Sequence, residues 1–196
     1  MEPLIVVISG PSGVGKSTVA GMVLEKALRL VRSVSLTTRK PRQGDVDGED
    51  YHFVSPEEFV ARRDAGGLLE WAEVHGNLYG TEAVQVDRQL SGGMSVLLEI
   101  DVQGGRSVKK ARPGAILIFL LPPSDEILEE RLRGRATDDE GVILKRLENA
   151  RRELESAEYY DYTVVNNDLD GCVSEVLGII GAESDKRGAE DPELPQ

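Results

Sequence analysis

The residues with the clearest chemical purpose form the stretch GPSGVGKST, from Gly10 to Thr18. The stretch matches the pattern G-x-x-x-x-G-K-[ST] at every fixed position and follows a short apolar, β-branched run. Its glycines let backbone N–H groups converge on an anion, and a helix beginning near Gly15 directs its positive end there. Lys16 is expected to reach the β- and γ-phosphates of a nucleotide, and the Ser17 hydroxyl to ligate Mg²⁺. The stretch therefore predicts a nucleoside triphosphate site.

A second group of cations stands out because the formal net charge of the chain is −12. Arg39, Lys40 and Arg42 lie within four residues of one another. A solvated loop, a nucleic-acid patch and a phosphate clamp would all use such residues. The sequence pI near 4.7 argues against a general nucleic-acid binder, which usually carries a basic face. Arg39 and Arg42 are spaced to place two guanidinium forks around one phosphate, a geometry that lysine does not reproduce.

Three carboxylates occupy apolar surroundings. Glu70 interrupts the apolar run of residues 68–72, where a buried charge needs hydrogen-bond donors; the alternative is a surface glutamate on the solvated face of a strand. Glu99 and Asp101 end another apolar run, and their i, i+2 spacing predicts that they share one face of a strand. Carboxylates at the end of a buried strand commonly hold Mg²⁺ or its waters. We favour Asp101 as the functional member of this pair.

The elements that would position these residues alternate between strands and helices. Apolar runs predict strands over residues 4–9, 95–101, 115–121 and 162–166, and residues 68–81 read as a strand and hairpin. Ser55 and Glu58 form a capping box that begins a helix, and Thr137–Glu140 form another. The helix that follows places Ile143, Leu144, Leu147 and Ala150 on one stripe. The pattern predicts an α/β fold of the doubly wound type, with a disordered tail from Glu183.

The bulk properties are those of one domain, with room for an inserted subdomain. The chain has 196 residues and a single cysteine, Cys172, so it forms no disulfide within the chain, which fits a reducing compartment. Its N-terminus lacks the basic region of a signal peptide, and no run approaches the roughly 20 apolar residues of a membrane span. These features predict a cytoplasmic protein.

The motifs together resemble those of the guanylate kinases, which transfer the γ-phosphate of ATP to GMP. The resemblance rests on the phosphate loop followed in order by SVSLTTRKPRQGDVDGEDYHFVS, LLEWAEVHGNLYGT, LLEIDVQG, RLRGRATDDE, ILKRL and YDYTVVNND. It extends from about Pro3 to Ile180. It implies a domain over residues 1–182 with a core (1–34, 90–125 and 156–182) in which helices flank a P-loop NTPase-type parallel sheet. A mixed or antiparallel β GMP-binding subdomain (35–89) and a helical lid (126–155) are inserted, and an acidic tail (183–196) follows.

The resemblance also implies the site residues. Glu70 would accept hydrogen bonds from the N1–H and N2 amino group of guanine, a donor pair that adenine lacks. Catalysis would use Lys16, Arg131, Arg135 and Arg146, and Mg²⁺ held by Ser17 and Asp101 would accompany ATP. ATP would contact Gly10, Pro11, Ser12, Gly13, Val14, Gly15, Lys16, Ser17, Thr18 and Asn166. GMP would contact Ser35, Arg39, Arg42, Tyr51, Glu70, Tyr79, Thr81 and Asp101. The lid departs from the usual pattern at Ala136, where a second glycine is typical.

Two other functions use similar features. Guanylate-kinase-like domains of some scaffold proteins bind phosphopeptides without catalysis, but their phosphate loops are usually degraded, whereas Lys16 and Ser17 are intact here. A kinase for another nucleoside monophosphate is the second alternative, and Glu70 with its hydroxyl partners argues against it. We expect ATP and GMP as substrates, and neither nucleic acid nor a membrane as a partner.

Overall fold

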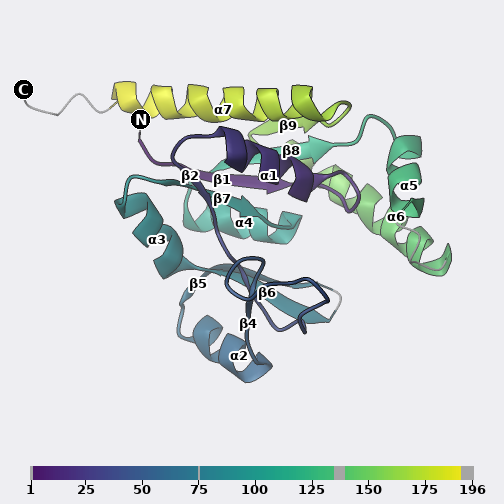
Figure 1. Ribbon diagram of the computed structural model, residues 1–196, viewed down its shortest axis with the longest axis horizontal. Helices are drawn as coiled ribbons and strands as arrows, with labels where there is room; N and C mark the ends of the chain where they lie inside the picture. The colour runs from purple at the N-terminus through teal and green to yellow at the C-terminus, as the bar shows by residue number, and fades with distance from the viewer. Residues whose placement is uncertain (1, 75, 135–139, 191–196) are drawn as a thin grey trace, which may run out of the picture.

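The core of the protein is a parallel sheet of five strands (Figure 1). The computed structural model describes residues 2–74, 76–134 and 140–190. The strand order is β2-β7-β1-β8-β9, with bounds β2 (Leu30–Arg32), β7 (Ser95–Glu99), β1 (Ile5–Ser9), β8 (Ile116–Leu121) and β9 (Tyr162–Val165). Strand β1 is buried at every position, which explains its unbroken apolar sequence. The predicted α/β architecture is confirmed.

Helices cover both faces of this sheet. Alternate side chains of β1 point to opposite faces. Val6 and Ile8 pack with helices α1 (Lys16–Lys26) and α7 (Leu169–Glu190). Ile5 and Val7 pack on the other face, under α3 (Ala83–Ser91), α4 (Val102–Ala111) and the 3₁₀-helix η1 (Glu155–Tyr159). The end of β1, from which the phosphate loop leaves, is therefore fixed on both sides.

A second sheet forms the lower lobe in Figure 1. Its order is β4-β3-β6-β5, with bounds β4 (His52–Phe53), β3 (Leu36–Thr37), β6 (Asn77–Glu82) and β5 (Leu68–Val74). Strands β3 and β4 are parallel and the other pairs antiparallel, so the sheet is mixed, as predicted. Helix α2 (Pro56–Asp64) begins at the predicted cap, where the Ser55 hydroxyl accepts the Glu58 N–H at 3.1 Å. Phe59 anchors this helix on the sheet because its side chain is fully buried.

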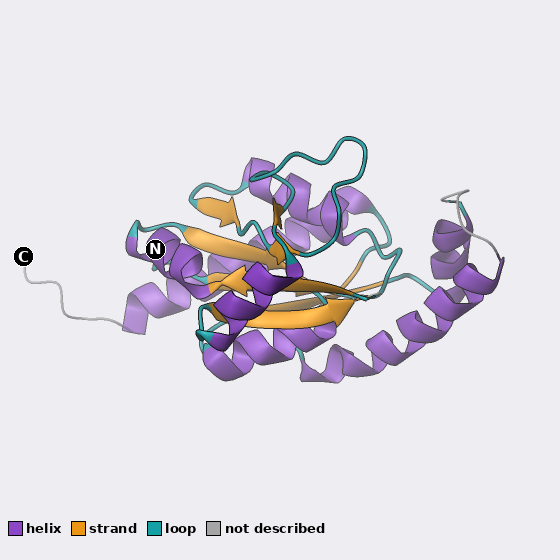
Figure 2. Cartoon of the chain, turned by 90° about the horizontal axis from the view of Figure 1, so that it is seen from below, coloured by secondary structure: helices purple, strands orange, loops and turns teal. Residues whose placement is uncertain are grey.

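Helices α5 (Asp125–Arg133) and α6 (Glu140–Leu154) project from one side of the core (Figure 2). They carry a small apolar cluster of their own: Leu128, Leu132, Ile143, Leu147 and Ala150. Leu144 was predicted to share this stripe and does not. Its side chain is exposed, because one residue beyond Ile143 the helix has turned by about 100°. Residues 137–139 of the second predicted capping box lie outside the described residues.

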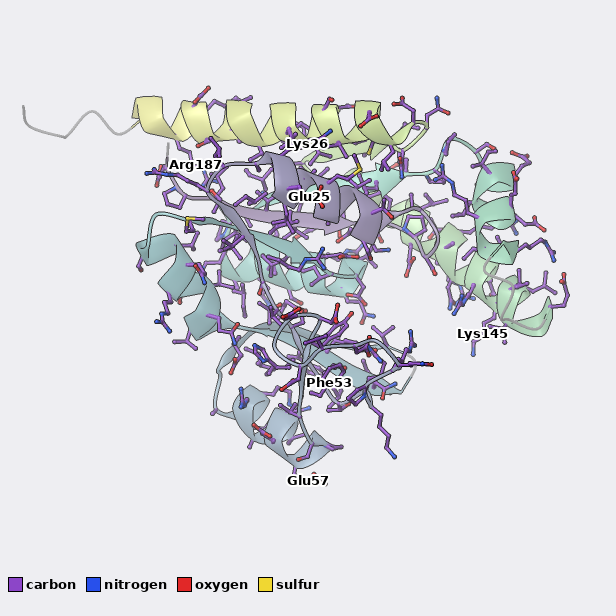
Figure 3. All side chains as sticks on the ribbon, viewed as in Figure 1. Glu25, Lys26, Phe53, Glu57, Lys145 and Arg187 are labelled. Carbon is purple, nitrogen blue, oxygen red and sulfur yellow. The ribbon has the colours of Figure 1, made fainter. Side chains whose placement is uncertain are left out.

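Helix α7 corrects the prediction of disorder from Glu183. The helix continues to Glu190 because its last turns are bonded to the core. The Tyr162 hydroxyl donates to Glu183 at 2.6 Å, and the Ser184 hydroxyl to the Glu2 carbonyl at 3.4 Å. Arg187, labelled in Figure 3, donates to the Gly114 carbonyl. Among the described helices, α7 included, none combines the length and apolar character needed to cross a bilayer.

Candidate active site

The phosphate loop connects β1 to α1 and is held in shape by its neighbours. Gly13 and Gly15 have φ angles of 87° and 97°, a left-handed conformation that glycine adopts without strain. The Asn166 side chain donates to the Val14 carbonyl at 2.7 Å, and Arg131 donates to the Asn166 carbonyl at 3.1 Å. A Cβ added to Gly15 would lie 2.8 Å from the Asn166 amide nitrogen. Contacts within the protein therefore hold the shape of the loop.

Lys16 begins α1 and lies at the mouth of this loop. Its ammonium nitrogen donates to the carbonyl oxygens of Gly10 at 2.6 Å and Pro11 at 3.1 Å. The side chain thus curls over the loop, with its charge beside the converging N–H groups. Its contact with the β- and γ-phosphates of a nucleotide stays a prediction.

Ser17 contacts Glu99 at the end of β7. The Ser17 hydroxyl donates to one carboxylate oxygen of Glu99, and a guanidinium nitrogen of Arg32 lies 3.9 Å from the other oxygen. A hydroxyl and a carboxylate side by side fit Mg²⁺, which takes few protein ligands and completes its shell with water and substrate phosphates. In the described part of the chain, no three His, Cys, Asp or Glu side chains gather as a metal site of their own.

Asp101 does not share a strand face with Glu99, contrary to the prediction. Strand β7 ends at Glu99, and Asp101 is the N-cap of α4, where its carboxylate accepts the Gly104 N–H at 2.8 Å. The chain leaves the sheet two residues before the end of the strand predicted over residues 95–101, and aspartate before a helix is a strong cap. Glu99, rather than Asp101, is the carboxylate in contact with Ser17.

In the lower lobe, two of the predicted acceptor residues, Tyr51 and Tyr79, lie near Arg39. Its guanidinium carbon lies 5.2 Å from the centre of the Tyr51 ring, and the Tyr51 and Tyr79 ring centres are 5.8 Å apart. Burial raises the pKa of the Tyr51 hydroxyl, which therefore stays a neutral hydrogen-bond donor. Arg42 is exposed. A cation flanked by two phenols suits a phosphate group.

Glu70 is a buried carboxylate on β5. Its side chain is only 5% exposed, and it accepts a hydrogen bond from the Thr81 hydroxyl at 2.7 Å. Burial, assisted by the negative charge of Asp101, raises its pKa to about 7. Helix α4 approaches so closely that a Cβ on Gly104 would lie 2.7 Å from a Glu70 oxygen. A ligand with two adjacent N–H groups would satisfy this carboxylate.

One cavity of about 320 Å³ joins the two halves of the site. The phosphate loop, the second sheet and the ends of β7 and α6 all contribute to its wall. The predicted site residues among its lining are Gly10, Ser12, Lys16, Ser35, Tyr51, Glu70, Tyr79 and Asp101. Thr81 lies behind Glu70 rather than on the wall. The structure thus brings the phosphate loop together with Glu70, Ser35 and the two tyrosines that were predicted to bind GMP.

The predicted lid arginines have different surroundings. Arg131 donates to the Val14 carbonyl at 3.4 Å, so it touches the phosphate loop itself. Arg146 lines an adjoining cavity together with Ser12 and Asp101. Arg135 lies outside the described residues. Asn166, predicted as an ATP contact, donates to the Val14 carbonyl of the phosphate loop.

Comparison with known proteins identifies the family. The guanylate kinase family model matches residues 2–183. The chain belongs to the guanylate kinase family. The guanylate kinase of Synechocystis sp. is 49% identical over 179 residues, which cover 91% of this chain and 94% of that protein. That of Corynebacterium diphtheriae is 48% identical over 178 residues, 90% and 93% of the two chains. The crystal structure of guanylate kinase from Anaplasma phagocytophilum matches with a TM-score of 0.77 at 37% identity, covering 92% of this chain and 86% of that one.

Membership of the guanylate kinase family confirms the resemblance seen in the sequence. Two carboxylates near the phosphate-binding groups were nevertheless missed. Asp45 bonds Arg39 at 2.8 Å, and Glu153 at the end of α6 accepts the Ser12 N–H at 3.3 Å. Asp45 is close to the arginines in sequence, which is a usable signal. Glu153 is 141 residues from Ser12, so no local pattern indicates their contact.

Glu153 places a carboxylate beside the phosphate loop, where it accepts the Ser12 N–H. Burial raises the pKa of its carboxyl group, and the Lys16 charge opposes that rise. We predict that Glu153→Gln tightens ADP binding by about fivefold, because removing one like charge near the phosphates favours ADP binding by about 1 kcal/mol. Titration calorimetry without Mg²⁺ measures the effect. Glu155→Gln, an exposed carboxylate two residues on, is the control; equal tightening in both variants would show only a general charge effect.

Proposed function

We propose that this guanylate kinase family member transfers the γ-phosphate of ATP to GMP, with Mg²⁺, giving ADP and GDP. The observation that carries the proposal is the buried Glu70 carboxylate in the same cavity as Lys16 and the phosphate loop. The relatives in the comparison bear the name guanylate kinase, which agrees with this activity. A cytoplasmic location stays a prediction.

The acceptor base is read by Glu70. Guanine presents its N1–H and N2 amino group side by side, and an ionised carboxylate accepts from both. Adenine places an acceptor at N1 instead, so it would leave the buried carboxylate opposed by a lone pair. The Ser35 hydroxyl on the cavity wall and the Thr81 hydroxyl behind Glu70 are further partners in this pocket. The acceptor phosphate would lie against Arg39 and the two tyrosines.

Phosphoryl transfer then needs positioning and charge neutralisation. An oxygen of the GMP phosphate attacks the γ-phosphorus in line, and the bond to the β–γ bridging oxygen breaks. Lys16 and the loop N–H groups hold the donor phosphates and oppose their growing charge. Ser17 and Glu99 would hold Mg²⁺, whose positive charge would help to neutralise the donor phosphates. No covalent enzyme intermediate is required.

The lid should exclude water when both substrates are bound. Water is a competing acceptor for the γ-phosphate, so closure protects ATP from hydrolysis. Helices α5 and α6 bury their apolar side chains against each other, which lets them move as one unit. Arg146 on α6 would then approach the transferred group.

An assay of ADP release tests the proposal with ATP-Mg²⁺ and GMP, AMP or dTMP in turn. We expect turnover with GMP at least about 10³-fold above that with AMP, because a site built to pair with a donor edge rejects a base that lacks it. Turnover with AMP and none with GMP would refute the proposal. Binding of GMP without any ADP release would favour the non-catalytic phosphopeptide-binding alternative.

A further inference from the structure

The loop between β3 and β4 is folded around one carboxylate, Asp45. A single oxygen of Asp45 accepts hydrogen bonds from Nη1 of Arg39 at 2.8 Å and from the backbone N–H of Arg42 at 2.7 Å. Nη1 of Arg39 also donates to the carbonyl of Lys40 at 3.0 Å. The Arg42 N–H and the Arg39 guanidinium lower the pKa of Asp45, so this carboxylate is ionised at neutral pH. The Asp45 carboxylate therefore holds both the side chain of Arg39 and the backbone at Arg42.

The contacts leave one edge of the Arg39 guanidinium available. A guanidinium has five N–H donors, and Nη1 supplies two of them. Both are directed to Asp45 and Lys40, whereas Nε and Nη2 form no hydrogen bond with any residue in the described ranges. The Arg39 side chain is only 12% exposed and lies over Tyr51 and Phe53, so it has little freedom to reorient. Nε and Nη2 form a two-pronged edge suited to a phosphate.

We propose that Asp45 is a positioning residue for the acceptor phosphate: it holds Arg39 so that its Nε–Nη2 edge meets the phosphate of GMP. This inference rests on the proposed function. The carboxylate never touches the nucleotide. It fixes the arginine before the ligand arrives, and so lowers the ordering cost of binding.

Asp45 stays bonded to Arg39 when GMP binds; it does not occupy the phosphate position as a competitor that the phosphate displaces. A competitor would bond the Nε–Nη2 edge of Arg39, which the phosphate needs, whereas Asp45 bonds Nη1. It would also have to give up the hydrogen bond that it accepts from the Arg42 N–H at 2.7 Å. The two roles predict opposite effects: losing a support weakens GMP binding, and losing a competitor strengthens it.

The test is Asp45→Asn, which keeps an oxygen for the Arg42 N–H and removes the charge that holds Arg39. We expect the KM for GMP to rise about 10- to 100-fold, the scale of one charge-assisted hydrogen bond, with the KM for ATP unchanged and kcat within about threefold. Binding of guanosine, which lacks the phosphate, should not change. Asp45→Glu should recover part of the GMP affinity.

Asp50→Asn is the matched control. Asp50 accepts a backbone N–H of the same loop, from Val46 at 2.8 Å, and its removal changes the net charge equally. The KM of the Asp50→Asn variant for GMP should stay within about twofold of the wild-type value, because Asp50 has no bond to Arg39 in the described contacts.

Three results would overturn the inference: a GMP KM that is unchanged or lower in Asp45→Asn, an equal loss of guanosine binding, or full additivity of Asp45→Asn with Arg39→Met. The last follows because a support acting through Arg39 loses most of its effect once that arginine is gone. Wild-type turnover of GMP is measured first. Its absence would refute the proposed function, whereas normal wild-type turnover with an unaffected Asp45→Asn would refute only the role of Asp45.

Discussion

Replacing Lys16 with methionine is expected to lower kcat with ATP and GMP by about 10³-fold or more. The substitution keeps most of the length of the side chain and removes the charge beside the phosphate loop, where it opposes the negative charge of the transferred phosphoryl. A loss of this size equals about 4 kcal/mol of transition-state stabilisation. Steady-state ADP release at saturating substrates measures it.

Lys26→Met is the control for this variant. Lys26 lies on the same helix and is labelled in Figure 3; within the described residues its one ion pair is an exposed contact with Asp170 at 3.5 Å. It should retain full activity because its charge is remote from the phosphate loop. The thermal unfolding temperatures of both variants should lie within a few degrees of that of the wild type. Activity of Lys16→Met close to that of the wild type would show that the loop does not act on the donor phosphates as described.

Glu70→Gln is expected to lower kcat/KM for GMP by about 10²- to 10³-fold. The variant loses the charge of two hydrogen bonds to guanine, and its amide N–H₂ would face a donor; together these cost about 3–4 kcal/mol. Kinetics with GMP over the pH range 6–9 measure the effect. Glu73→Gln, an exposed glutamate on the same strand, should change kcat/KM for GMP less than about threefold.

The same substitution should stabilise the empty protein at high pH. The Glu70 carboxyl has a pKa of about 7 in the fold and about 4.5 when unfolded. The folded state therefore holds a proton that the unfolded state has released, and the free energy of unfolding falls as pH rises from about 4.5 to 7. Above pH 7 the full penalty applies, on the order of 3 kcal/mol. Urea unfolding should find Glu70→Gln more stable than wild type at pH 8 and similar to it at pH 4.

Guanosine affinity should also depend on the ionisation of the Glu70 carboxyl. Only the ionised carboxylate accepts from both N–H groups of guanine, so wild-type affinity should fall as pH drops below about 7, and Glu70→Gln should show a flat profile. Guanosine is the probe because it lacks a phosphate that titrates nearby. A flat wild-type profile, or a variant no more stable at pH 8, would mean that Glu70 is not a buried ionised acceptor.

The sequence predicted those parts of the site that depend on consecutive residues. The phosphate loop is local, because a strand, three glycines and Lys16 in one run determine both its shape and its ligand. The Ser55 cap is local for the same reason. Glu70 was recognisable because a charge within an apolar run demands a partner.

Contacts between distant segments were not predictable. Whether Asp101 ends a strand or caps a helix depends on where α4 packs, and the apolar pattern continues through Ile100 in either case. The turns after Glu183 are polar and read as disordered, yet bonds to Tyr162 and Glu2 hold them in a helix. Glu153 reaches the phosphate loop only because α6 returns to the core beside it. Such contacts follow from the tertiary fold rather than from spacing.

Following the γ-phosphate itself tests the central claim most directly. ATP labelled in the γ-phosphate is incubated with Mg²⁺, the protein and equal amounts of GMP and AMP, and the products are separated. The account predicts that the label appears in GDP, with little in ADP or inorganic phosphate. Label recovered in ADP formed from AMP, or only in inorganic phosphate, would contradict it.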